Sequence, residues 1–205
     1  MEEFKMGLFL QVLVMPGCKE AEARAAVETV AEKYSCSFDA LESGEPIADE
    51  DIIISELIPD ECQYVESAGG VSILINDSCI GYDSLAKVVS GESGKVVLLL
   101  YIYDGDYWGY ELYDKGAFTD QFNPVPDYFD QVSEEDLKKS EGNAQIIASY
   151  FHVEQASIEK YLVRWSEDTM DVKAYEDDEF GYEDWQMADF MRKLGYPYDF
   201  GEECE

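Results

Sequence analysis

The most apolar run in this sequence is residues 95–103, KVVLLLYIY. A short run without polar alternation that contains β-branched residues is typical of a central strand whose two faces are both covered. We therefore predict a sheet in which this segment is an inner strand. The segments before and after it must then supply the neighbouring strands and the covering helices.

The first hundred residues alternate between strand-like and helix-like patterns. Residues 8–15, LFLQVLVM, predict a buried strand that ends at Pro16-Gly17. A helix should follow, because six apolar residues recur with the spacing of one helical face: Ala23, Ala26, Val27, Val30, Ala31 and Tyr34. The remaining patterns predict strands at 51–57, 70–76 and 95–103, and a helix at 82–89. This β-α-β-β-α-β order predicts an α+β fold, a ferredoxin-like two-layer sandwich.

The second hundred residues predict an extension of that sheet followed by helices. Asp104-Gly105 is a hairpin turn signal, and it leads into strands expected at 107–113 and 117–122, an antiparallel meander. The two prolines of Asn123-Pro124-Val125-Pro126 should end strand formation. Helices are expected after Ser133, after Gly142-Asn143, over 153–165 and over about 183–194.

The shift from strands to helices near residue 130 suggests a division of the chain. We expect residues 1–130 to form the α+β sandwich, with a mixed or antiparallel sheet. Residues 131–195 are expected to be a helical extension packed onto the same domain, and residues 196–205 a flexible tail.

The charge of the chain is strongly negative. Forty-six Asp and Glu face 14 Lys and Arg, which gives a formal net charge of -32 at pH 7. Such a surface repels nucleic acid and anionic membranes, and it attracts basic proteins from a distance. Because 46% of the residues are hydrophobic and 14% aromatic, the chain can still build a core. We therefore expect a basic protein partner, no nucleic acid and no membrane.

The first residues of the sequence, its apolar runs and its cysteines predict a cytoplasmic location. The apolar run at 7–15 is short and follows Glu2 and Glu3, where a signal peptide would need positive charge. No apolar run approaches the roughly 20 residues of a membrane span. The five cysteines are odd in number and form no CxxC pair, which is typical of free thiols in a reducing compartment.

Two segments are candidates for partner binding. The first lies between Lys33 and Lys87, where twelve acids occur without any Lys or Arg, and Asp49, Glu50 and Asp51 are its candidate rim charges. The second is the run 101–114, YIYDGDYWGYELYD, in which Tyr and Trp side chains could bury area while keeping a polar group. Its candidate contact residues are Asp104, Asp106, Tyr107, Trp108, Glu111 and Tyr113. The alternatives are a solvated acidic loop region for the first, and packing between sheet and helices for the second.

Motifs of catalysis are weak in this sequence. The only histidine is His152, in an apolar context that favours a structural role, and there is no GxSxG. Residues 90–95, SGESGK, lack the glycine spacing of a phosphate-binding loop. The acidic segment 176–184, EDDEFGYED, lacks the alternating ligands of a calcium loop. We therefore expect no cofactor and no specific metal site.

These observations favour a non-enzymatic acidic protein-binding module, in its most specific form an immunity or antitoxin-like inhibitor of a basic protein. The acidic surface would speed association, and aromatic anchors would slow dissociation. The alternative is a carboxylate-site hydrolase or a divalent-metal-dependent enzyme. A third interpretation is a structural domain of a larger assembly.

Overall fold

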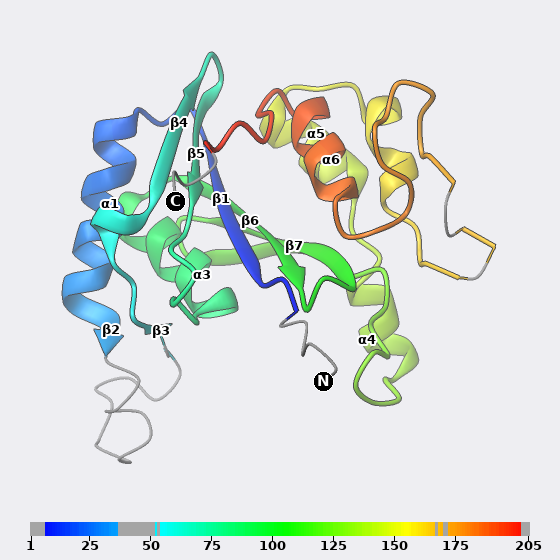
Figure 1. The fold of residues 1–205 in the computed structure, drawn as a ribbon, viewed down its shortest axis with the longest axis horizontal. Coiled ribbons are helices and arrows are strands. Elements are labelled where there is room, and N and C mark those ends of the chain that lie inside the picture. Colours follow the sequence, from blue (N-terminus) through cyan, green and yellow to red (C-terminus); the bar gives the residue numbers. More distant parts are fainter. Residues whose placement is uncertain (1–6, 37–51, 53, 167, 170–171, 202–205) are drawn as a thin grey trace, which may run out of the picture. The chain divides into compact units, whose positions relative to one another are not determined.

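The computed structural model describes residues 7–36, 52, 54–166, 168–169 and 172–201 (Figure 1). It has an α+β fold with a mostly antiparallel sheet of six strands in the order β4-β5-β1-β6-β7-β8. A separate parallel pair joins two short strands, β2 (Ser35–Cys36) and β3 (Ile54–Ser55). The predicted α+β class is therefore confirmed. The chain also contains no described helix that is long and apolar enough to cross a membrane.

Most predicted elements occur close to their expected positions. The sheet strands are β1 (Leu10–Pro16), β4 (Gln63–Ser67), β5 (Gly70–Leu74), β6 (Val96–Tyr103), β7 (Tyr107–Asp114) and β8 (Ala117–Phe122). The helices are α1 (Glu20–Tyr34), α3 (Tyr82–Ser93), α4 (Glu134–Lys139), α5 (Ala144–Phe151) and α6 (Gln186–Lys193). The expected side-chain caps also form, since Ser133 accepts a hydrogen bond at the start of α4 and Asn143 accepts two at the start of α5.

The described residues divide into two compact units. The first unit contains the described residues of 7–10, 100–110 and 120–198, and the second contains those of 11–99, 111–119 and 199–201. Strands β6, β7 and β8 contribute residues to both units. The division expected at residue 130 stays a prediction.

The second unit is built on the β4-β5 hairpin and β1. Strands β1 and β5 pair antiparallel, with Val12 opposite Leu74 and Pro16 opposite Gly70. Helix α1 packs against α3 and the hairpin strands (Figure 1). The buried face of α1 is the stripe that its sequence predicts, with Ala23, Ala26, Val27 and Val30 inside. This apolar layer holds the unit together through burial of the helix face.

The first unit has an aromatic core. Trp108 and Tyr110 on β7 lie 5.1 and 6.0 Å, centroid to centroid, from the ring of Phe190 on α6. Phe122 on β8 completes the group at 5.2 Å from Trp108. All four side chains are at most 1% exposed. Offset and tilted aromatic pairs of this kind add to the free energy of burial, so they anchor α6 in its unit.

The α-helix that the sequence predicts over residues 153–165 does not form. This segment instead contains two short 3₁₀ helices, Gln155–Ser157 and Glu159–Tyr161. His152 ends α5 in a left-handed conformation with φ 56°. The backbone N–H of Lys160 donates to the hydroxyl of Tyr175 at 3.2 Å, which replaces an α-helical partner with a tertiary one. Tertiary hydrogen bonds therefore override the local helical periodicity here.

The strand that the sequence predicts at 51–57 is shorter than expected, and it lies in another sheet. In its described part, only Ile54–Ser55 is a strand, and it pairs with β2 outside the main sheet. The main sheet instead uses Gln63–Ser67, which no sequence pattern predicted, because the residues of β4 are polar and half exposed.

The four described cysteines, Cys18, Cys36, Cys62 and Cys79, are free thiols as expected. Cys204 lies outside the described residues.

Candidate functional site

The turn between β6 and β7 holds the acidic residues that the sequence singled out. Asp104 and Gly105 both have positive φ, 55° and 69°, the pattern of a type I′ hairpin turn. The N–H of Asp106 donates to the carbonyl of Tyr103 at 3.0 Å and closes the turn. Asp104 and Asp106 are both exposed. The predicted hairpin turn is therefore confirmed, and it holds two carboxylates at the surface of the first unit.

Five aromatic rings from three separate segments surround this turn, and we call them the turn cluster: Phe9, Tyr103, Tyr107, Tyr128 and Phe129. Tyr103 is central, at 5.1 Å from Phe9, 5.6 Å from Tyr107 and 5.3 Å from Phe129. Phe129 is 66% exposed and Phe9 47%. Single exposed apolar residues are ordinary, but rings gathered beside two carboxylates form a contact surface.

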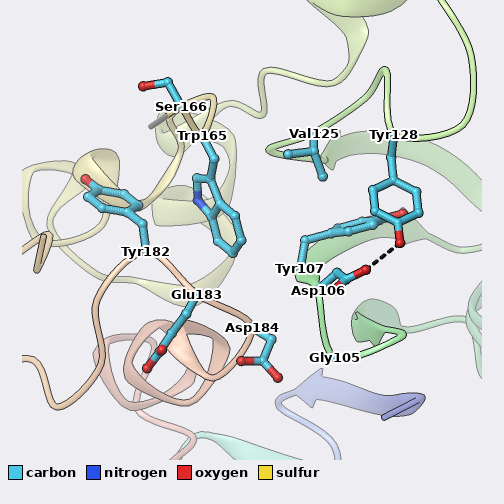
Figure 2. Close-up of a pocket in the computed structure, with 10 residues that line it drawn as sticks. All are labelled: Gly105, Asp106, Tyr107, Val125, Tyr128, Trp165, Ser166, Tyr182, Glu183 and Asp184. Carbon is cyan, nitrogen blue, oxygen red and sulfur yellow. Dashed lines mark hydrogen bonds between the residues drawn. The ribbon is translucent and has the colours of Figure 1, made fainter. Parts of the chain in front are cut away.

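Tyr128 links the turn cluster to the acidic turn. Its hydroxyl donates a short hydrogen bond to Oδ2 of Asp106 (Figure 2). This bond stabilises the protonated phenol, so the pKa of Tyr128 rises to about 12. The pKa of Tyr107 is also raised, mainly by burial. Both rings therefore stay neutral at physiological pH, and the negative charge at this place belongs to the carboxylates.

A cavity of about 550 Å³ opens next to the turn cluster, entirely within the first unit. Its lining residues are Gly105, Asp106, Tyr107, Val125, Tyr128, Trp165, Ser166, Tyr182, Glu183 and Asp184. Figure 2 shows Trp165 on one side and the pair Tyr107 and Tyr128 on the other, with the carboxylate of Asp184 between them. The cavity therefore has aromatic walls and an acidic floor.

The charge in this cavity is of one sign. Three of its ten lining residues are acidic, and none of the ten is basic. Burial raises the pKa of Asp184, and the nearby charge of Asp106 adds to the rise. A bound cation would lower the electrostatic free energy of both carboxylates, because each would gain a partner of opposite charge. The arrangement is thus suited to hold a positive group between aromatic faces.

The structure separates the residues that the sequence grouped as candidates. Asp104, Asp106 and Tyr107 come together at the turn of the first unit. Trp108 is 0% exposed and belongs to the aromatic core. Glu111 and Tyr113 belong to the second unit, where the hydroxyl of Tyr113 donates to Oε2 of Glu111 at 2.8 Å. Asp49, Glu50 and Asp51 lie outside the described residues.

Sequence reasoning missed the residues that complete the site. Tyr128 and Phe129 follow the double-proline segment, while Trp165 and Asp184 come from far along the chain. A signal was present in the strings DYFD at 127–130 and GYEDW at 181–185, which repeat the combination of acids and aromatics seen at the turn. That similarity of composition was the only clue that these segments meet.

Other chemistry in the described residues is sparse. His152 is exposed at the end of α5, where its backbone N–H donates to the carbonyl of Ala148. Across the described residues, no three His, Cys, Asp or Glu side chains are grouped so that they could hold a metal ion. A second cavity, of about 580 Å³, lies in the second unit beside Asp60, Glu61 and Asp77, and its described lining contains no aromatic ring. The aromatic and acidic cavity is therefore the stronger candidate.

Comparisons with known proteins supply no family. No family model matches the chain, and neither a curated protein nor a solved structure matches it.

Proposed function

We propose that this protein is a non-enzymatic binding module that receives a basic protein at the acidic turn and its aromatic cluster. The observation that carries the proposal is that Asp104 and Asp106 stand exposed beside Tyr128 and Phe129, which are 40% and 66% exposed. Carboxylates attract and orient a basic surface, and exposed aromatic rings supply buried area once contact is made. The specific form that we propose is an immunity or antitoxin-like inhibitor of a basic protein.

The charge of the whole chain supports this proposal. A protein with a formal net charge of -32 creates a long-range attractive field for a cationic partner, and this field raises the association rate at low salt. Because salt screens the field over roughly 8–10 Å, affinity should fall as ionic strength rises. An inhibitor must bind its target fast, so such steering fits that role.

The fold proposal is that the second unit and β6 follow a ferredoxin-like plan. The strand order β4-β5-β1-β6, with α1 between β1 and β4 and α3 between β5 and β6, supports this. Strands β7 and β8 would then be the added meander. We further propose that the protein acts in the cytoplasm, which its free thiols support.

The experiment that tests the function compares two matched triple variants. The partner is captured from the source cell at low salt, identified by mass spectrometry and purified. Its affinity is then measured for Asp104→Asn/Asp106→Asn/Phe129→Ala and for Asp60→Asn/Asp77→Asn/Ile80→Ala. Both variants lose two carboxylates and one exposed apolar side chain, but the second set lies in the second unit.

The variant at the acidic turn, Asp104→Asn/Asp106→Asn/Phe129→Ala, should bind the partner about tenfold or more weakly. Its affinity should also depend less on salt. The matched variant should change affinity by less than about twofold, because its three substitutions lie away from the acidic turn and reduce the net negative charge by the same amount. Equal effects of the two variants would mean that the acidic turn is not the binding surface. Glu111→Gln and Tyr113→Phe test separately whether the second unit takes part.

A carboxylate-site hydrolase is the second candidate. The observation that favours it is the position of the Asp184 carboxyl in the cavity. Its pKa is raised by burial, a change that suits a general acid. A divalent cation that stays with the purified protein in stoichiometric amount would favour the enzymatic interpretation. Loose cation binding that disappears in moderate salt would count against it.

A further inference from the structure

The cavity beside the acidic turn has the chemistry of a receptor for one flat cation. We propose that it receives the guanidinium group of an arginine side chain that the basic partner presents, held by Asp106 and Asp184 between Trp165 and the Tyr107–Tyr128 pair. This inference rests on the proposed function for the identity of the partner. It goes further by naming the group that enters the protein.

The walls of the cavity favour a planar cation. Trp165 lies on one side and Tyr107 and Tyr128 on the other (Figure 2). An aromatic face attracts a cation through its quadrupole, and arginine stacks on such faces better than lysine because its charge is delocalised over a plane. The cavity, at about 550 Å³, lies within the size range of small-molecule sites, so a side chain of this length can be accommodated.

The carboxylates supply the in-plane partners. A guanidinium group carries five N–H donors in a fixed fork and pairs well with carboxylate oxygens. Asp184 lies between the aromatic walls, and Asp106 lies at the edge where Tyr128 holds its Oδ2. Oδ1 of Asp184 accepts the backbone N–H of the next residue, Trp185, at 2.9 Å, just before α6 begins. The acidic groups are thus held in place before a ligand arrives, which lowers the entropy cost of binding.

The lining of this cavity contains no positive charge that would compete with an entering cation. None of its ten lining residues is Lys or Arg. The nearest arginine along the chain, Arg164, is paired with Asp127 at 2.6 Å. An arginine from outside would therefore be the first positive group to meet Asp106 and Asp184 together.

The first test uses the full-length protein and a small probe, N-acetyl-arginine amide. Two matched probes are N-acetyl-citrulline amide, which has nearly the same shape without the charge, and Nα-acetyl-lysine amide, which has the charge without the plane. Binding is followed by NMR shifts of the Trp165 indole and of the backbone amides of Asp106 and Asp184. We expect the arginine probe to bind with a Kd on the order of 1 mM, a value normal for one side chain.

The lysine probe should bind several-fold more weakly, and the citrulline probe should not bind. Asp106→Asn and Asp184→Asn should each weaken the arginine probe by about tenfold, the usual effect of losing one charge-assisted hydrogen bond. Asp60→Asn/Asp77→Asn, in the second unit, is the control and should leave it unchanged. Circular dichroism of each variant establishes that it is folded.

The outcomes separate this inference from the proposed function. If citrulline binds as well as arginine, or if the shifts lie elsewhere, the guanidinium site is wrong. The basic partner could then still lose affinity for the Asp104→Asn/Asp106→Asn/Phe129→Ala variant, and the proposed function would stand alone. If the arginine probe shifts Trp165 but the partner binds that variant normally, the cavity is a guanidinium site and the proposed partner surface is wrong. If the probe also competes with the partner, both are supported.

Discussion

The hydroxyl of Tyr161 donates a hydrogen bond of 2.5 Å to Oδ1 of Asp178, and these two buried side chains organise the C-terminal part of the first unit. Nη2 of Arg192 lies 3.3 Å from the same oxygen, and the N–H of Tyr175 donates to Oδ2 at 2.8 Å. A buried carboxylate is tolerated only when its oxygens have such partners. Asp178 thereby ties an acidic loop to α6 and to the 3₁₀ helix of Tyr161.

Removal of the Tyr161 hydroxyl should therefore destabilise the protein. Tyr161→Phe leaves one buried oxygen with fewer donors, and we expect the free energy of unfolding in urea to fall by about 1–2 kcal/mol. Tyr128→Phe is the matched control, since it also removes a phenol bound to an aspartate, but at an exposed place. The control should change stability by less than about 0.5 kcal/mol. Equal losses in both variants would contradict the role of burial.

Asp177 should titrate at unusually low pH. Nζ of Lys193 lies 2.6 and 2.7 Å from its two oxygens, and Nη1 of Arg192 lies 3.2 Å away. These partners lower the pKa of Asp177 from 3.8 to about 2. Because the folded-state pKa is below the unfolded value, this pairing stabilises the fold above pH 3.8. Its contribution is lost as the pH falls through about 2.

An NMR titration of the Asp177 carboxyl measures this directly. In Lys193→Gln the midpoint should move up toward 3.8, since the largest cause of the low pKa is removed. High salt should move it in the same direction, because Asp177 is exposed and its charge is screened. A midpoint that stays near 2 in the variant would show that Lys193 is not the cause.

The sequence was sufficient where local chemistry decides the structure. KVVLLLYIY predicts β6, and the buried face of α1 follows its apolar spacing residue by residue. Asp104-Gly105 predicts the turn, because only a few residue types adopt two successive positive φ angles without strain. These features depend on neighbours in the chain, and periodicity or turn chemistry is enough to find them.

Packing between distant segments was not predictable in the same way. Strand β4 is defined by its pairing with β5, since its own residues QYVES have no strong strand pattern. At the candidate site, Asp106 and Tyr107 were found from their local run. Trp165 and Asp184 reach the same cavity only through tertiary packing, which no spacing in the sequence encodes.

Neutralising Asp120 should make the protein more stable at neutral pH relative to the wild type. Its Oδ2 accepts the hydroxyl of Tyr110 at 2.7 Å and the N–H of Asn143 at 2.9 Å. Burial nevertheless raises the pKa of Asp120 above 3.8. A carboxyl with a raised folded-state pKa favours the fold when protonated, so this contribution is present below pH 3.8 and is lost as pH rises through the folded-state value.

Asp120→Asn cannot ionise, and its amide oxygen can still accept both hydrogen bonds. The free energy of unfolding of this variant, relative to that of the wild type, should therefore increase as pH is raised from about 4 to 7. Asp120→Ala leaves the buried hydroxyl of Tyr110 without its acceptor, and the N–H of Asn143 keeps only its longer bond of 3.3 Å to that hydroxyl, so this variant should lose about 1–3 kcal/mol. A constant difference between Asp120→Asn and the wild type over this pH range would contradict the raised pKa.

Trp108 and Gln186 form a buried polar pair whose energetic coupling can be measured. The indole N–H of Trp108 donates to Oε1 of Gln186 at 3.2 Å, and both residues are 0% exposed. Nε2 of Gln186 has no hydrogen-bond partner among the described residues. Trp108→Phe should cost about 1–3 kcal/mol, because it removes packing volume and leaves the amide of Gln186 without its donor.

Gln186→Met should also destabilise, since it leaves the indole N–H buried and unpaired. The double variant has no unpaired polar group at this place, so its loss should be smaller than the sum of the single losses by about 0.5–3 kcal/mol. Urea unfolding of the four proteins gives this coupling, and additive losses would contradict it.

Folded Trp108→Phe should bind the basic partner as the wild type does, because the ring has no exposed surface. A loss of affinity in the folded variant would instead give Trp108 a part in binding, through the β7 strand that also carries Tyr107.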